Sequence, residues 1–131
     1  MNRQALRDEV AGFFDGFVEA FRSFSGARIA ALYLVPYVAA RGDGSVGYLQ
    51  SRADVERYFQ AAVDGYYGDG CRPCRFKDLE VVPIGPRAAL GTVTWELLRD
   101  DGTVLKIWRQ SYNLVRIEGG LRVLASTDHG E

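Results

Sequence analysis

The chain has 131 residues, with 16 Lys and Arg against 17 Asp and Glu, 47% apolar residues and 25% charged residues. This length and composition predict one globular domain over residues 1–131, which can bury a core without a metal ion or a disulfide. A formal net charge of −1 argues against a nucleic-acid partner, because proteins that bind nucleic acids usually carry a clustered basic surface. No apolar stretch is long enough to span a membrane, and acidic residues near the N-terminus do not fit a secretory signal. We therefore expect no membrane partner and a cytoplasmic location.

The first half of the sequence has the periodicity of helices. Between residues 5 and 24 the apolar residues recur at spacings of three and four, which predicts a long amphipathic helix. Ser25 precedes a second, short helix over residues 27–34, which Pro36 ends. A short strand over residues 37–40 and a turn over residues 41–45 follow. Ser51 is then placed to cap a third helix over residues 52–67.

The second half of the sequence changes to the period of two that is typical of strands. Turn sequences around Gly85, Gly102 and Gly119 divide it into strands over residues 75–82, 87–99, 103–117 and 121–129. Two of these strands are far longer than usual. An antiparallel meander of such strands must curve strongly to bury one face against three helices, so the predicted fold class is α+β.

Three stretches of the chain suggest a known family. They are residues 13–17 (FFDGF), residues 51–59 (SRADVERYF) and residues 119–129 (GGLRVLASTDH). With the order of the elements, they resemble the nuclear-transport-factor-2-like superfamily, which includes ketosteroid isomerase, scytalone dehydratase, limonene epoxide hydrolase and the SnoaL-like polyketide cyclases. The resemblance covers nearly the whole chain. It implies a cone, in which helices pack on the concave side of a curved sheet, leave a pocket, and leave a convex side that often forms a dimer.

The sequence does not match the catalytic residues of two enzymes of the superfamily. Ketosteroid isomerase uses an Asp base and a Tyr–Asp oxyanion hole, but the long strands of this sequence offer no inward Asp. The first helix offers Phe13, Phe14 and Phe17 where a Tyr facing the pocket would be needed. Limonene epoxide hydrolase has an Arg flanked by two Asp in its pocket, whereas Arg109 here is followed two residues later by Ser111.

The last three long strands can be sorted into two faces. The turns at residues 100–102 and 118–120 fix their pairing, which places Thr94 opposite Arg109. Strict alternation of side chains then gives one polar and one aromatic face. Superfamily members place the positions of Leu121 and Val123 inside the cone, and these two residues fall on the polar face, so we expect the polar face to be concave. Its polar members are Thr92, Thr94, Glu96, Arg109, Ser111, Asn113, Thr127 and His129.

Three of these side chains are candidates for catalysis. His129 would be the proton-transfer group, Glu96 a second carboxylate or partner of the His, and Arg109 the group that stabilises an anion. Arg109 also favours a carboxylate-bearing ligand, because a guanidinium can bind both oxygens of a carboxylate. One His and one carboxylate are too few to hold a transition metal, so neither a metal nor a cofactor is expected. The candidate ligand-binding residues are Tyr33, Tyr37, Thr92, Thr94, Ser111, Asn113 and Thr127.

The aromatic face determines what we expect of partners. If the polar face is concave, the aromatic side chains form an exposed patch that a soluble monomer rarely tolerates, which predicts a homodimer through the convex face. The alternative is that the aromatic face is the core and the polar residues face water. The residues of the aromatic patch are Val93, Trp95, Leu97, Trp108 and Tyr112.

Two functions stay open at this point. The first is a pocket that binds a small polar or carboxylate-bearing metabolite without catalysis, or a dimeric interaction module. The alternative is a cofactor-free isomerase, dehydratase, cyclase or hydrolase that uses acid–base chemistry in the pocket. The missing inward Asp and the position of His129, the one His and close to the C-terminus, favour the first function.

Cys71 and Cys74 form a Cys-x-x-Cys pair. A redox pair of this kind belongs at the start of a helix that follows a strand, whereas this pair precedes a strand. A zinc site needs four ligands, and His129 is the one further candidate. We interpret the two cysteines as structural thiols of a loop and leave open whether they form a disulfide.

Overall fold

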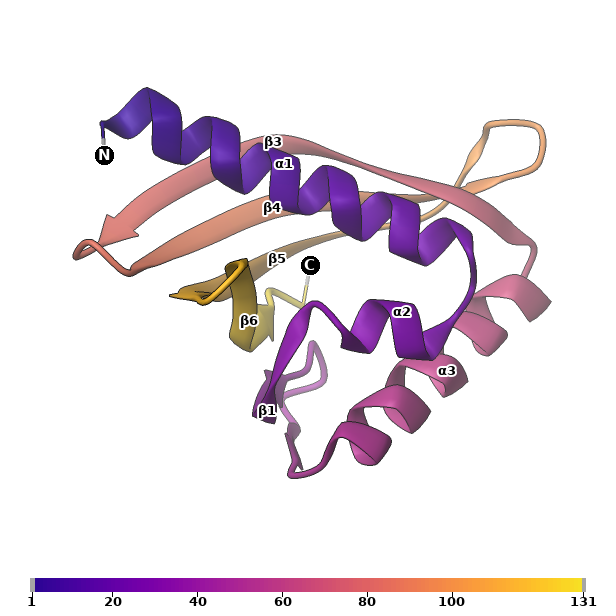
Figure 1. Ribbon diagram of the computed structural model, residues 1–131. Coiled ribbons are helices and arrows are strands. Elements are labelled where there is room, and N and C mark those ends of the chain that lie inside the picture. Colours follow the sequence, from indigo (N-terminus) through magenta and orange to yellow (C-terminus); the bar gives the residue numbers. More distant parts are fainter. Residues whose placement is uncertain (1, 131) are drawn as a thin grey trace.

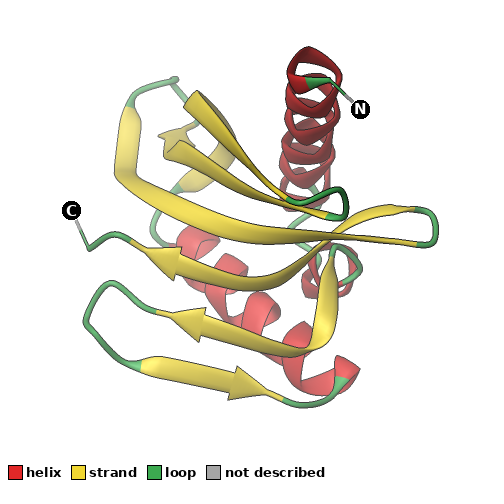
Figure 2. Cartoon of the chain, turned by 90° about the vertical axis from the view of Figure 1, so that its left-hand side faces the viewer, coloured by secondary structure: helices red, strands yellow, loops and turns green. Residues whose placement is uncertain are grey.

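The computed structural model describes residues 2–130, which form three helices and six strands. The helices are α1 (Arg3–Arg22), α2 (Gly26–Ala30) and α3 (Arg52–Gly68). The strands are β1 (Tyr33–Ala40), β2 (Val46–Leu49), β3 (Cys71–Ile84), β4 (Ala88–Arg99), β5 (Val104–Ile117) and β6 (Gly120–Asp128). They form one sheet in the order β2-β1-β6-β5-β4-β3, in which β1 and β6 are parallel and all other neighbours are antiparallel. The predicted α+β class with a curved, mostly antiparallel sheet is confirmed (Figure 2).

Serine side chains cap the N-termini of the second and third helices, as the sequence predicts. The Ser25 hydroxyl accepts a hydrogen bond from the Arg28 N–H at 3.3 Å, and the Ser51 hydroxyl accepts one from the Asp54 N–H at 3.1 Å. The second helix is shorter than predicted, because β1 already begins at Tyr33 and pairs with β6. Tertiary pairing of the strand has therefore overridden a local helical pattern.

The first part of the sheet contains more strand than predicted. The turn over residues 41–45 closes a hairpin, in which the Arg41 N–H donates to the Ser45 carbonyl at 2.8 Å. Its second arm is β2, a four-residue edge strand that the sequence analysis did not predict. Strand β3 begins at Cys71, so the Cys-x-x-Cys pair lies within a strand and not in a loop.

The helices cover the concave face of the sheet, and the core lies between the helices and the sheet. Helix α1 runs along β3 and β4, and α2 and α3 lie toward β1 (Figure 1). Phe14 of α1 contacts the rings of Tyr112 and Trp95, with centroid distances of 5.3 and 6.0 Å. Gly26 permits the close approach of α2 to α3, since a Cβ there would collide with the Gln60 backbone. Gln60 also accepts a hydrogen bond from the Gly26 N–H at 2.8 Å.

The predicted pairing of the long strands is confirmed, but the predicted choice of the concave face is wrong. Thr94 lies opposite Arg109, and Ser111 lies opposite Thr127. The aromatic face nevertheless points toward the helices, and Trp95 is only 3% exposed. The polar face is convex and points away from the helices, so the alternative stated in the sequence analysis is the observed arrangement.

A β-bulge at Leu124 explains this inversion. Asn113 of β5 lies opposite Ala125, whereas the next residue, Leu114, lies opposite Val123, so that Leu124 is an extra residue in β6. Leu121 and Val123 are buried on the concave side, as the resemblance implies. Past the bulge the alternation of β6 is reversed, and the polar residues that follow Val123 in strict alternation fall on the convex side.

Candidate functional site

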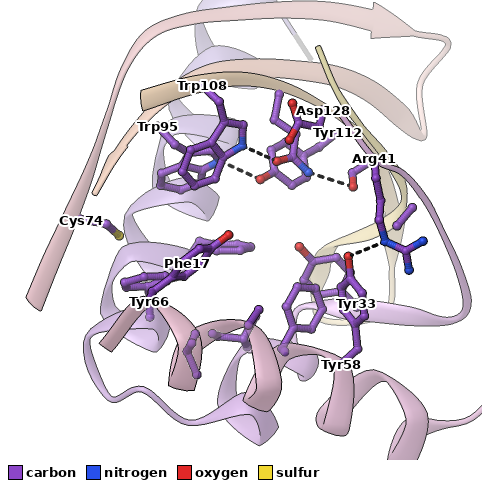
Figure 3. A pocket seen from close by; sticks show the side chains of 18 of the residues that line it. Phe17, Tyr33, Arg41, Tyr58, Tyr66, Cys74, Trp95, Trp108, Tyr112 and Asp128 are labelled. Atoms are coloured by element: carbon purple, nitrogen blue, oxygen red, sulfur yellow. Dashed lines mark hydrogen bonds between the residues drawn. The ribbon is translucent and has the colours of Figure 1, made fainter. Parts of the chain in front are cut away.

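A cavity of about 250 Å³ lies between α3 and the concave face of the sheet. Its floor comes from α3 and β1, and its roof comes from β4, β5 and β6 (Figure 3). Most of its lining is apolar or aromatic, which is typical of ligand-binding pockets. The aromatic lining residues are Phe17, Phe21, Tyr33, Tyr37, Tyr58, Phe59, Tyr66, Trp95, Trp108 and Tyr112.

The aromatic rings pack against one another and hold the cavity walls in place. Phe17 of α1 lies 5.2 Å from Trp95, centroid to centroid, at one end. At the other end the ring of Tyr33 lies 4.6 Å from both Tyr37 and Phe59. Such edge-to-face and tilted ring pairs restrict side-chain motion and leave flat surfaces toward the cavity. Packed aromatic rings therefore bound the cavity at both of these ends.

One wall of the cavity carries a chain of hydrogen bonds with a defined direction. The Trp108 indole can only donate, and it donates to Oε1 of Gln110 at 2.8 Å. This fixes the amide orientation, so Nε2 of Gln110 donates to the Ser126 hydroxyl at 3.0 Å. The Ser126 hydroxyl lies 2.6 Å from the Tyr37 hydroxyl, and the Tyr33 ring packs against the Tyr37 ring with a centroid distance of 4.6 Å. We call Gln110, Ser126, Tyr37 and Tyr33 the polar wall.

The polar wall has more hydrogen-bond donors than acceptors. Two hydroxyl groups, of Tyr37 and Ser126, share one mutual contact, and Ser126 also accepts from Gln110, so one hydroxyl hydrogen of the pair has no acceptor among the described residues. Burial raises the pKa of Tyr37 to about 12, and it raises the pKa of Tyr33 well above its usual value. Both phenols therefore keep their hydrogens at neutral pH.

A second surplus hydrogen belongs to Tyr112. The Trp95 indole donates to the Tyr112 hydroxyl at 2.7 Å, and the hydroxyl then has its own hydrogen left to donate. No described residue accepts that hydrogen. Burial raises the pKa of Tyr112 well above its usual value, so this hydrogen too stays in place. The polar wall and Tyr112 therefore both offer a hydroxyl hydrogen to a ligand that brings an acceptor atom.

Charged side chains lie at one end of the cavity. Asp128, near the end of β6, lines the cavity and accepts a hydrogen bond from the Gly130 N–H at 2.9 Å. Arg41, at the end of β1, also lines it and donates from Nε to the Tyr58 hydroxyl at 3.4 Å. The expectation that the strands offer no inward Asp is therefore wrong, and its cause is the same bulge in β6. Asp128 is the one carboxylate among the cavity-lining residues that the structure describes.

Of the sequence-predicted site residues, two line the cavity. They are Tyr33 and Tyr37, both of which are 2% exposed. The placement of the other predicted residues in the pocket is wrong, because all of them lie on the convex face of the sheet. These are Glu96, Arg109 and His129, together with Thr92, Thr94, Ser111, Asn113 and Thr127.

The structure brings part of this convex set together in a small hydroxyl cluster. The Ser111 hydroxyl lies 2.8 Å from the Thr92 hydroxyl and 2.9 Å from Nε2 of His129. Arg109 is not part of that cluster, since it binds the Thr94 hydroxyl, the Asp78 carbonyl and Glu80.

Glu96 does not meet Arg109 or His129. Its carboxylate is bound by Arg75 at 2.7 Å and by Lys77 at 3.5 Å, and the Arg75 hydrogen bond lowers the pKa of the Glu96 carboxyl. The three candidate catalytic groups therefore do not converge on one cavity.

The aromatic patch expected to form a dimer interface is part of the core. Val93, Trp95, Leu97 and Tyr112 are each 3% exposed or less, and Trp108 packs against this core and lines the cavity. The expected exposure of these five side chains is wrong, because the concave and convex faces are exchanged. Homodimerisation itself stays a prediction, but the aromatic patch no longer supports it.

Both cysteines are buried and free, which answers the open question of the disulfide. Cys74 lines the cavity, and burial raises the pKa of its thiol to about 12. No group of three or more His, Cys, Asp or Glu side chains within residues 2–130 is placed to hold a metal ion. In the same part of the chain, no helix is long and apolar enough to cross a membrane.

Sequence reasoning missed four polar residues of the cavity. Gln110, Ser126 and Asp128 lie on the side of the aromatic face, which the sequence analysis expected to be convex, and Arg41 was interpreted only as part of a turn. The available signal was the aromatic face itself. Two Trp and a Tyr on one side of a half-buried sheet favour that side as the core.

Comparison with protein families gives one match. Residues 8–131 match the family described as NTF2-like protein (DUF6841). The chain belongs to this NTF2-like family. A comparison with proteins of curated function finds no significant match.

Solved structures share the fold of this NTF2-like protein. Aln2 from a Streptomyces species superposes with a TM-score of 0.78 at 20% identity, covering 98% of this chain and 92% of Aln2. A candidate dehydratase of the NTF2-like family from Streptomyces avermitilis gives 0.73 at 16% identity, covering 97% and 96%. A domain of unknown function with a cystatin-like fold from Nostoc punctiforme gives 0.73 at 16% identity, covering 99% and 80%. At these identities the similarity shows the fold alone.

Proposed function

We propose that this NTF2-like protein binds a small, flat ring compound in its cavity and holds an acceptor oxygen of that compound at the polar wall. The observation that carries the proposal is the surplus of hydroxyl hydrogens facing an aromatic cavity. A carbonyl or similar oxygen would satisfy those hydrogens, whereas a buried donor without an acceptor is costly. The proposed ligand is small and partly polar, like the one expected from the sequence, but it would contact different residues.

The aromatic lining supports the apolar part of this proposal. Rings of the ligand can stack on Trp95 and Trp108 from the roof and on Phe59 and Tyr66 from the floor. A cavity of about 250 Å³ accommodates one or two fused rings and excludes larger ligands unless it opens. We therefore infer that a compound with two fused rings and one carbonyl group is a suitable probe.

The test uses matched ligands that share the indane ring system. We expect 2-indanone to bind more tightly than indane by about fivefold to tenfold in titration calorimetry, because its carbonyl accepts a hydrogen bond from the polar wall. 2-Aminoindane, which carries an ammonium donor in place of the carbonyl, is expected to bind more weakly than 2-indanone. Equal affinities for 2-indanone and indane, or no binding of either, would contradict the proposal.

The position of Asp128 favours a second candidate function, cofactor-free acid–base catalysis. Its carboxylate could take a proton from the carbon next to a bound carbonyl, while the polar wall donates hydrogen bonds to the enolate oxygen that results. One structurally similar protein is named as a candidate dehydratase, which is compatible with chemistry of this class.

Hydrogen–deuterium exchange in bound 2-indanone separates the two candidates. An enzyme of this kind would accelerate exchange of the α-hydrogens into deuterated water, as followed by proton NMR, and Asp128→Asn would abolish the acceleration while keeping the ligand bound. A binding protein would leave the exchange rate at its value in buffer.

A further inference from the structure

We propose that Arg41 is the anion-binding residue of the cavity and that the natural ligand carries a carboxylate at the mouth. The proposal rests on the proposed function, because the carboxylate would belong to the same ring compound. The sequence analysis expected a carboxylate-bearing ligand on Arg109, which the structure places on the other face of the sheet.

The Arg41 side chain is held in position at the rim of the cavity. Nε donates to the Tyr58 hydroxyl at 3.4 Å, and the guanidinium carbon lies 5.3 Å from the centre of the Tyr58 ring. Nη1 donates to the Ser45 hydroxyl at 3.4 Å. These contacts come from α3 and from the β1–β2 turn, so both sides of the mouth orient the same guanidinium.

Gly47 makes room for this position of Arg41. Gly47 is buried in β2, and a Cβ added to it would overlap the Arg41 guanidinium, with Nη2 as the nearest atom. An Ala at this position would therefore displace the guanidinium. Because the displaced atoms are the far end of a flexible side chain, the sheet itself can remain intact.

Arg41 has no ion pair within the described part of the chain. Hydrogen bonds from the hydroxyl and the backbone N–H of Ser45, at 2.6 and 2.9 Å, and to a smaller extent the Arg41 charge lower the pKa of the Asp43 carboxyl, but Asp43 forms no ion pair with Arg41. Asp128 ends the neighbouring strand, and its carboxylate is bound by the Gly130 N–H. Lys106 does not line the cavity, but its Nζ lies 5.1 Å from the ring of the lining residue Trp108.

A positioned guanidinium without a carboxylate partner is a suitable receptor for one. Its planar array of N–H donors matches the two oxygens of a carboxylate. Figure 3 shows Arg41 on the opposite side of the cavity from Trp95 and Cys74. A ligand whose rings lie beside Trp95 would therefore place a carboxylate on its other end near Arg41.

Titration calorimetry with indane-2-carboxylate and indane-2-carboxamide tests this inference, because the two probes differ in charge and little in shape. The wild type is expected to bind the carboxylate about tenfold more tightly than the amide. Arg41→Gln should remove this preference without changing the affinity for the amide. Arg28→Gln removes an exposed Arg of α2 far from the mouth, and it should leave the preference intact.

Gly47→Ala is the second test variant, because it displaces Arg41 without removing it. It should reduce the preference for the carboxylate, whereas Gly12→Ala, where a Cβ meets no other atom, should not. Circular dichroism checks that each variant is folded. If Gly47→Ala does not fold, the result for Arg41→Gln decides the outcome.

Three results would overturn the inference. The first is equal affinity of the wild type for the carboxylate and the amide, and the second is a preference for the carboxylate that survives in Arg41→Gln. The third is tighter binding of the cationic 2-(aminomethyl)indane than of the carboxylate, which would make Asp128 the dominant charge. If the amide and 2-indanone bind in any of these cases, the proposed function stands without the inference. If no indane binds, both are wrong.

Discussion

The hydroxyl groups of Tyr37 and Ser126 lie 2.6 Å apart, although 89 residues separate them in the sequence. The contact joins β1 to β6, the one parallel pair among the described strands. It also links the floor of the cavity to its roof. The same hydroxyl pair therefore has a structural role and a proposed role in ligand binding.

Ser126→Ala tests both roles. The substitution leaves the Gln110 amide and the Tyr37 hydroxyl without their partner, so we expect the free energy of unfolding to fall by about 1–3 kcal/mol in urea denaturation. The Tyr37 hydroxyl and the Gln110 amide then both have a hydrogen free to donate, so 2-indanone should still bind more tightly than indane. A variant that shows no preference for 2-indanone would show that these donors do not bind the carbonyl.

Arg109→Met is expected to change stability and not ligand binding. Arg109 donates to the Asp78 carbonyl and the Thr94 hydroxyl, both at 3.0 Å, and it pairs with Glu80 at 3.1 Å. These contacts hold a bulge in β3, where Asp78 has a positive φ of 55°. We expect a loss of about 1–2 kcal/mol in unfolding free energy.

Ligand titration provides the second readout for Arg109→Met. The affinities for 2-indanone and indane-2-carboxylate should match those of the wild type. A selective loss of affinity for the carboxylate would return the anion-binding role to Arg109.

The sequence predicts the pairing of the long strands better than it predicts which side of them is buried. The turn at residues 100–102 is local, so its chemistry sets Thr94 opposite Arg109 correctly. The buried side was inferred from Leu121 and Val123 by strict alternation, and one extra residue, Leu124, reverses that alternation. A bulge depends on contacts with neighbouring strands, which a single sequence does not display.

The candidate site was predicted only where it did not depend on β6. Tyr33 and Tyr37 precede the bulged strand in the chain and line the cavity, and their role in ligand binding stays a prediction. Ser126 and Asp128 follow the bulge, so strict alternation placed them on the wrong side. Arg41 is positioned by Gly47, a contact across a hairpin whose second strand was not predicted.

The ion pair between Glu9 and Arg116 should make stability depend on pH. Arg116 donates to both carboxylate oxygens of Glu9, at 2.5 and 2.7 Å, which lowers the pKa of the Glu9 carboxyl in the folded protein. Ionised Glu9 therefore stabilises the fold fully above its unfolded pKa of about 4.3, and the stabilisation is lost as the pH falls through the lowered folded value.

Urea denaturation of the wild type and Glu9→Gln checks this dependence. The wild type should be more stable at pH 7, and the difference should shrink as the pH falls below about 4. A difference that stays constant or grows over that range would contradict the role assigned to the pair.

The cysteines should be unreactive in the folded protein. Burial raises the pKa of the Cys74 thiol to about 12 and also raises the pKa of the Cys71 thiol, so neither forms much thiolate at pH 8. We expect both to react with a thiol reagent such as Ellman's reagent only after unfolding in guanidinium chloride. Rapid reaction of the native protein would show that the cavity exposes Cys74 to solvent.

NMR of the two tryptophan side chains tests the central claim most directly, since the chain's two Trp residues, Trp95 and Trp108, both line the cavity. The indole N–H of Trp95 donates to Tyr112, and that of Trp108 donates to Gln110, so both report on the cavity walls. In a titration of ¹⁵N-labelled protein with 2-indanone, both indole signals should shift and saturate together. Unchanged indole signals, with shifts confined to His129 and Ser111 on the convex face, would show that ligands bind elsewhere.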